Sequence, residues 1–285
     1  DTAMPNASQN EKIIASQYVL ANCGYNVRLA LCGNHVVMLI PYVEHVFEKS
    51  YLNIDGKRYY IYPNVEDEGS FRSCELPKGA ELGKDMGLRF TGKTVIGDEA
   101  KPFRYEAAGI TLQGEVPTGV MPLLNEYPII DIPTVAASVV DKSLRDDVVK
   151  QIRAQVQDLG EQEAANRILR FIQKGFPYAT DDEQFHREKY FYFEESLYYP
   201  KNDCEDRAIF YAYLVHEILG LDVHLIQFPG HECTAVAFHE PVENGTSYEY
   251  KGKKFYICDP TYIGAKIGKC MPSYAKESPQ IEVWY

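Results

Sequence analysis

The apolar positions in the second half of the chain recur at helical spacing. In residues 142–159 and again in residues 161–173, an apolar side chain appears every three or four positions, which predicts two amphipathic helices. A more uniformly apolar stretch runs from Cys204 to Leu219 and is followed by Gly220, a residue that commonly ends helices. We therefore expect a third helix that begins at or beside Cys204.

Short runs of β-branched and aromatic residues follow this third helix and predict strands. The segment between the second and third helices is instead rich in aromatic residues, carboxylates and turn signals, which favours a loop. Helices that precede a group of strands are typical of an α+β fold with an antiparallel sheet. The predicted strands are residues 223–228, 234–238, 254–258 and 281–284.

The two halves of the chain carry an internal repeat. Sliding the sequence against itself by the 196 residues that separate His35 from His231 superposes two distant blocks without a gap. The second block aligns IDGKRYYIYPN with YKGKKFYICDP. Because one offset serves both blocks, we interpret residues 8–64 as a degenerate second copy of the C-terminal half. The alternative is that two α+β segments share a turn and a strand start by chance.

The repeat suggests a division into three parts. Residues 1–65 form the degenerate copy, residues 66–140 a β-rich connector or subdomain with short apolar runs such as Gly109–Leu112 and Pro128–Ile132, and residues 141–285 the main domain. The first copy also lacks counterparts of the two helices that precede Cys204, and the chain begins at Asp1, so we expect that a leader was removed or that the chain is part of a longer protein.

Composition and charge exclude several classes of protein. The chain has 285 residues, of which 45% are apolar and 25% charged, as in globular proteins. A net charge of −12, with scattered basic residues, argues against binding to nucleic acid. No run of eighteen apolar residues is present, so we expect no membrane-spanning helix.

The seven cysteines include no C-x-x-C pair, so they fit neither an even disulfide framework nor a zinc knuckle. If one is a nucleophile, the other six are either paired in an oxidising compartment or buried as reduced thiols. A zinc site made by Cys204, His231, Cys233 and Cys258 matches no common ligand spacing.

Three residues at the edges of predicted elements suggest nucleophilic catalysis. Cys204 lies where a helix begins, and the free N–H groups there stabilise a thiolate and a tetrahedral oxyanion. His231 follows the Pro229-Gly230 turn at the start of a strand, and Asp259 ends a strand. A base within reach of the thiol and an acid that orients the base form a Cys-His-Asp triad.

The motifs around these residues resemble the transglutaminase-like superfamily, particularly its bacterial cysteine protease members. They are N-D-C-E-D-R-A at 202–208, P-G-H at 229–231 and C-D-P-T-Y at 258–262, and the resemblance extends from about Ala164 to Tyr262.

This resemblance implies a papain-like core, in which a helix bearing the nucleophile packs on an antiparallel sheet. It also implies that Cys204 is the nucleophile, His231 the base, Asp259 the orienting acid and Asp206 a structural carboxylate. No metal or cofactor is required. The first copy has Ser8 in place of Cys204, and Pro63 takes the place of Asp259 there, so we expect that copy to be inactive.

One departure from the family pattern bears on whether the reaction is transamidation or hydrolysis. Transglutaminases often carry a tryptophan near the histidine or before the cysteine, whereas the single tryptophan here is Trp284. The oxyanion donor is therefore unassigned, with Gln184 and Tyr178 as candidates. Because transamidation needs a site that shields the acyl-enzyme from water, hydrolysis is the preferred interpretation.

We therefore expect a cysteine peptidase or amidase that acts on a peptide or protein substrate. The alternatives are a transamidase of the same mechanism and a noncatalytic binding or scaffold protein with a vestigial triad. The start at Asp1, the tyrosine-rich composition and the resemblance indicate an exported bacterial protein, periplasmic or at the cell surface.

Overall fold

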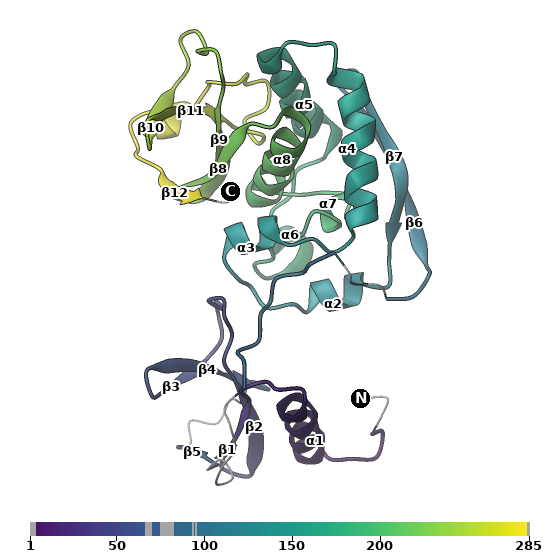
Figure 1. The fold of residues 1–285 in the computed structure, drawn as a ribbon, viewed down its shortest axis with the longest axis vertical. Coiled ribbons are helices and arrows are strands. Elements are labelled where there is room, and N and C mark those ends of the chain that lie inside the picture. The colour runs from purple at the N-terminus through teal and green to yellow at the C-terminus, as the bar shows by residue number, and fades with distance from the viewer. Residues whose placement is uncertain (1–3, 66–69, 75–82, 93, 95, 284–285) are drawn as a thin grey trace. The chain divides into compact units, whose positions relative to one another are not determined.

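The computed structural model describes residues 4–65, 70–74, 83–92, 94 and 96–283. The chain forms two compact units, Asp1–Leu88 and Arg89–Tyr285 (Figure 1). Both units combine helices with an antiparallel sheet, so the α+β class is confirmed.

The second unit is built on a five-stranded antiparallel sheet. Its strand order is β10-β11-β9-β8-β12. The predicted strands all form, and β10 is an additional strand that we did not predict. Of the predicted 281–284 strand, Trp284 lies outside the described residues. The strands are β8 (Asp222–Phe228), β9 (His231–Ala237), β10 (Ser247–Tyr250), β11 (Lys253–Cys258) and β12 (Gln280–Val283).

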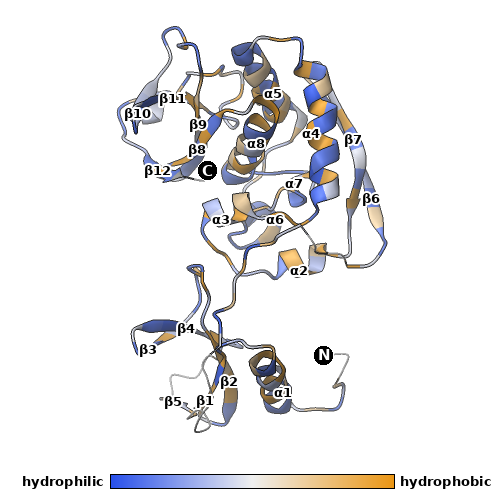
Figure 2. Cartoon of the chain, viewed as in Figure 1, coloured by the Kyte–Doolittle hydropathy of each residue, from blue (hydrophilic) through white to orange (hydrophobic). Residues whose placement is uncertain are grey.

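Helix α8 (Cys204–Leu219) packs on strands β8 and β9 and is covered by other helices on its remaining sides. It ends as predicted at Gly220, whose φ of +69° is the left-handed conformation that glycine adopts easily. Two longer helices, α4 (Lys142–Val156) and α5 (Glu161–Gly175), pack against α8. In Figure 2, α4 carries both orange and blue residues, as expected of an amphipathic helix.

The segment predicted as a connector belongs to two different units. Its middle forms the hairpin β6 (Ala100–Ala107) and β7 (Ile110–Pro117), which contacts α4 and α5 of the second unit. The boundaries predicted at residues 65 and 140 therefore differ from the single division after Leu88. The composition of this segment indicates local structure such as strands and turns. It does not predict the long-range contacts that decide to which unit they belong.

The short apolar run Pro128–Ile132 of this segment is not part of any named strand. Instead, Ile132 opens the short helix α3 (Ile132–Ala137). The Asp131 carboxylate accepts a hydrogen bond from Thr134 N at 2.9 Å, and a proline follows in the first turn of the helix. An aspartate cap and an early proline together start a helix, and they outweigh the strand preference of the apolar run. The other short helices are α2 (Met121–Asn125), α6 (Asp181–Phe185) and α7 (Glu195–Tyr198).

The described residues of the first unit form one helix and a second five-stranded sheet. Its strand order is β3-β4-β2-β1-β5, and all neighbouring strands are antiparallel. The elements are α1 (Gln9–Asn22), β1 (Arg28–Cys32), β2 (His35–Ile40), β3 (Tyr51–Ile54), β4 (Lys57–Tyr62) and β5 (Phe71–Ser73).

The two sheets share their strand order and most of their register. When 196 is added to the residue numbers, β3 and β4 coincide with β10 and β11 residue for residue. The pair Leu29–Met38 of β1 and β2 likewise becomes the pair Leu225–Thr234 of β8 and β9. Only the outer strands, β5 and β12, fall outside this offset. The repeat seen in the sequence is thus matched by equivalent strands with equivalent pairing.

Within the described parts of the chain, no helix has the length and apolar character needed to cross a membrane.

Candidate active site

Cys204 is the first residue of helix α8, and the N-cap is Asp203. The position is fixed by Asp206, which is fully buried one turn into the helix. Its carboxylate accepts hydrogen bonds from Asp203 N at 3.2 Å and from Phe191 N at 2.8 Å. Asp206 thus joins the helix start to the preceding loop.

His231 and Asp259 form a buried pair. His231 opens β9 after a turn in which Gly230 has a φ of +70°, a conformation that favours glycine. Its Nε2 lies 2.9 Å from Asp259 Oδ2, and only 1% of the Asp259 surface is exposed. The contact to Asp259 occupies Nε2, so Nδ1 is the ring nitrogen left for proton transfer. Tyr274 stacks on the imidazole, with ring centroids 5.3 Å apart and planes 7° from parallel.

The second oxygen of Asp259 is also fixed. Asp259 Oδ1 accepts hydrogen bonds from the backbone N–H groups of Thr261, at 2.8 Å, and Tyr262, at 3.0 Å. Both carboxylate oxygens therefore have defined partners, which sets the orientation of the acid and through it the imidazole.

Gln173 of α5 holds the loop that carries Asp259, and our sequence analysis did not identify it. Its Nε2 donates to three carbonyl oxygens of this loop, and its Oε1 accepts a hydrogen bond from Gly264 N at 3.2 Å. Only 3% of the Gln173 surface is exposed. The available signal was its spacing, since Gln173 continues the apolar stripe of Ala165 and Leu169 at intervals of four residues. The three carbonyl groups are those of Asp259, Tyr262 and Ala265.

Cys204 and His231 line the same cleft, whose volume is about 370 Å³. Of the two candidates for the oxyanion donor, Tyr178 lines this cleft, whereas Gln184 donates its side-chain N–H to Ala179 O. The remaining lining residues are Ile132, Thr180, Asp181, Asp182, Glu188, Tyr190, Asp203, Glu205, Gln227, Gly230 and Glu232.

The Cys204 thiol donates a hydrogen bond to Glu205 Oε2 at 3.0 Å rather than to His231. Burial, followed by the charge and hydrogen bond of Glu205, raises the pKa of the thiol. The backbone N–H of Glu232, the residue after His231, also contacts the sulfur and acts in the opposite direction. The thiol therefore lies beside β9, the strand that His231 opens, and its raised pKa favours the protonated form in this arrangement.

The cleft is strongly acidic. Burial and the neighbouring Asp203 raise the pKa of Asp181 to about 7. Burial and Glu205 raise the pKa of Asp203 to about 8. For Glu232, burial and the charges of Glu282 and Glu205 raise the pKa to about 9. The same two causes act in all three shifts. Burial disfavours the charged carboxylate, and the negative charges of neighbouring carboxylates disfavour it further.

Three groups of described residues bring their ligand atoms within 4.8 Å of one another, as a metal site requires. Two are carboxylate groups of the cleft that share Asp181, one with Glu188 and Glu205 and the other with Asp203 and Asp206. Oxygen-only sets of this kind suit hard cations such as Ca²⁺. The third combines His231 and Asp259 with Cys233 and includes neither Cys204 nor Cys258, the other ligands of the zinc site considered above.

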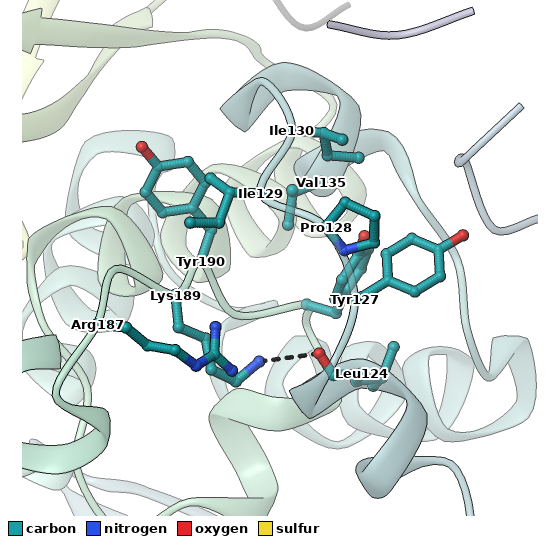
Figure 3. A pocket seen from close by; sticks show the side chains of 10 residues that line it. Leu124, Tyr127, Pro128, Ile129, Ile130, Val135, Arg187, Lys189 and Tyr190 are labelled. Carbon is teal, nitrogen blue, oxygen red and sulfur yellow. Dashed lines mark hydrogen bonds between the residues drawn. The ribbon is translucent and has the colours of Figure 1, made fainter. Parts of the chain in front are cut away.

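A buried lysine holds the loop that supplies the acidic residues. Lys189 Nζ lies 2.6 Å from Glu195 Oε1 and donates to Leu124 O at 3.3 Å, the dashed line in Figure 3. Its backbone N–H donates to Asp181 Oδ2 at 2.5 Å. The pocket drawn in Figure 3 has a volume of about 10 Å³, enough for about one water molecule. The larger cleft beside Cys204 is therefore the candidate site for a substrate.

A second buried ion pair fixes the same loop from helix α4. Arg145 Nε lies 2.8 Å from Glu194 Oε1, and both side chains are fully buried. Glu194 also accepts a hydrogen bond from Asp141 N at 2.9 Å, just before α4 begins. Two ion pairs, separated by few residues in sequence, thus hold the loop that leads to Cys204.

None of the seven cysteines is in a disulfide, and Cys32, Cys233 and Cys258 are buried. Buried thiols of this kind pack as small, weakly polar groups.

In the first unit, the counterparts of the triad have other surroundings. Ser8 is the N-cap of α1, where its Oγ accepts a hydrogen bond from Glu11 N at 3.3 Å. His35 opens β2 as His231 opens β9, but Pro63 follows β4 where an acid would be needed. The counterpart of the nucleophile thus serves as a helix cap.

No protein-family model matches the chain, and no curated protein is significantly similar to it in sequence.

Proposed function

We propose that the protein is a cysteine hydrolase of the transglutaminase-like, papain-like type that cleaves peptide or amide bonds. The observation that carries the proposal is the buried contact between His231 Nε2 and Asp259 Oδ2 at 2.9 Å, because His231 lines the same cleft as Cys204 at the start of α8.

The proposed reaction begins when Nδ1 of His231 takes the proton of the Cys204 thiol. The sulfur then attacks the substrate carbonyl, and His231 returns the proton to the leaving amine. Water hydrolyses the resulting thioester with His231 again as the base, which releases the acid product and restores the thiol. Asp259 stabilises the imidazolium in both steps. Backbone N–H groups at the start of α8 are placed to stabilise the oxyanion, with Tyr178 as an additional donor.

A second candidate function has its own supporting observation. The thiol donates to Glu205, and its pKa is raised rather than lowered, as in a cysteine that is not a nucleophile. This arrangement favours a noncatalytic binding protein with a vestigial triad. Transamidation shares the acyl-enzyme with hydrolysis and is detected as an amine adduct among the products.

The test is incubation of the protein with a diverse peptide mixture, followed by mass spectrometry of the products. Hydrolysis is expected with the unchanged protein and not with Cys204→Ala or His231→Ala. A control variant, Cys270→Ala, removes a thiol outside the cleft and should retain activity. A thioester on Cys204, trapped by acid quenching, would identify the nucleophile. If the three variants and the unchanged protein all leave the peptides intact, the noncatalytic function replaces the hydrolase.

A further inference from the structure

The cleft around Cys204 has an unbalanced charge. Six of its fourteen lining residues are aspartate or glutamate, and none is lysine or arginine. The buried cations Lys189 and Arg207 are engaged elsewhere, since Lys189 pairs with Glu195 and Arg207 donates to Asn202 Oδ1 at 2.8 Å. The carboxylates of the cleft thus have no cationic side chain among its lining residues.

Glu232 differs from the carboxylates of an ordinary acidic surface, which are exposed to water. Only 3% of its surface is exposed, and neither carboxylate oxygen has a hydrogen-bond partner among the described residues. Asp181 Oδ1 and Asp203 Oδ1 are also buried without such a partner. A buried acceptor without a donor is unfavourable, and four such oxygens on three side chains of one cleft indicate that donors arrive with a ligand.

Glu232 directly follows His231 in the chain, so the unsatisfied carboxyl group lies close to the residues of the proposed hydrolysis. A group that satisfies Glu232 lies beside the base and the nucleophile, whose sulfur contacts the Glu232 backbone N–H. An ammonium group offers three donors and a guanidinium group five, and either one would satisfy several carboxylates at once.

We propose that the cleft recognises a lysine or arginine side chain of the peptide substrate, close to the bond that is cleaved, through Glu232 and Asp181. This inference rests on the proposed hydrolase function and names its substrate class. The positive charge also draws the Glu205 carboxylate towards the ligand, because Glu205 lies within 4.8 Å of Asp181 through their carboxylate oxygens. That movement weakens the hydrogen bond that keeps the Cys204 thiol protonated.

The experiment measures peptide binding to Cys204→Ala, which cannot turn over. A fluorescent peptide that contains lysine is compared, by anisotropy, with the same peptide in which the lysine is acetylated, and the lysine is moved through successive positions. EDTA in the buffer keeps divalent cations out of the carboxylate groups. At the best position, we expect at least roughly tenfold tighter binding of the lysine peptide, and this preference should decrease as salt is added.

A matched pair of variants locates the effect. Glu232→Gln should abolish most of the preference, whereas Glu249→Gln, an equal change of charge at an exposed position on β10, should leave it intact. Equal affinity for both peptides, or no binding of either, would overturn the inference. An equal loss in the two variants would also overturn it, because it would reveal only long-range attraction. The binding experiment does not depend on catalysis. If the protein prefers the lysine peptide but hydrolyses no peptide, the proposed hydrolase function is contradicted and the recognition of lysine is not.

Discussion

Glu205 Oε2 lies 3.0 Å from Cys204 Sγ and accepts the hydrogen bond of the thiol. The adjacent residue in sequence therefore opposes the effect of the helix N-terminus, which by itself stabilises a thiolate. Burial acts in the same direction as Glu205 and raises the pKa of Cys204. We therefore expect the Cys204 thiol to become more reactive when this carboxylate is neutralised or displaced.

Replacing Glu205 with glutamine should therefore activate the thiol. Glutamine keeps the size and an acceptor oxygen but removes the negative charge, so the pKa of Cys204 should fall. We expect alkylation of Cys204 by iodoacetamide at pH 7.5 to become several-fold faster, as read by peptide mass spectrometry across a pH series. Glu188→Gln, in the same cleft, is the control and should change the rate little. An unchanged pH profile in Glu205→Gln would show that burial alone holds the proton.

The His231–Asp259 pair leads to a second prediction. Asp259→Asn retains a similar shape but cannot stabilise an imidazolium by charge, so turnover of a peptide substrate should fall by about 10²- to 10⁴-fold. KM should change little, because Asp259 is buried behind His231 and does not line the cleft. Steady-state kinetics on a cleaved peptide provide the measurement. The exposed change Asp222→Asn, in the same sheet, should have no comparable effect, and a full rate in Asp259→Asn would remove Asp259 from the mechanism.

The sequence predicted the three long helices and four of the five sheet strands of the second unit closely because their signals are local. Strand β10 was missed, and so were the short helices α6 and α7, which lie in the segment predicted as a loop. Helix α8 begins at Cys204 and ends at Leu219, as the apolar run and Gly220 indicate. The repeat was detectable for a different reason. Residues that start strands and turns, such as Gly56 and Gly252, keep the same spacing in both copies, and the strand register follows that spacing.

The acidic cleft could not be predicted in the same way. Asp181 and Glu232 are far apart in sequence, and Asp181 lies in a segment that is predicted only as a polar loop. Their proximity depends on the buried pairs of Lys189 and Arg145, whose charged side chains resemble ordinary surface residues in the sequence. The hydrogen bond from the Cys204 thiol to Glu205 was also missed. It depends on the direction in which the Glu205 side chain points, and residue spacing does not predict that direction.

Gln173 should couple the stability of the second unit to its activity. Gln173→Leu keeps the side chain's approximate size but removes the donor for three carbonyl groups and the acceptor for Gly264 N. Leaving these buried groups unsatisfied should lower the free energy of unfolding by about 1–3 kcal/mol. Denaturant unfolding measures this change. Turnover should also fall, because the Asp259 loop loses its anchor, while the exposed change Gln157→Leu at the C-cap of α4 should affect neither quantity.

The unpartnered carboxyl of Glu232 predicts a stability that depends on pH. Its pKa is raised from 4.5 to about 9, so between these values the folded protein retains a proton that the unfolded chain releases. The contribution of Glu232 to stability is therefore fully present below about pH 4.5 and is lost as the pH rises towards 9. Asp181 and Asp203, whose pKa values are also raised, act in the same direction.

Glu232→Gln removes this titration and should make the protein more stable than the unchanged chain at pH 8. One pKa unit corresponds to about 1.4 kcal/mol, so even a fraction of the shift should raise Tm at pH 8 by a few degrees, roughly 2–4 °C per kcal/mol for a unit of this size. At pH 4.5 the two proteins should unfold at nearly the same temperature. Calorimetry at the two pH values makes the comparison, and an equal difference in Tm at both would show that the proton on Glu232 is not involved. The stabilised variant should at the same time lose its preference for lysine peptides, because the unpartnered carboxyl group of Glu232 that destabilises the free protein is also the group that we propose binds the substrate cation.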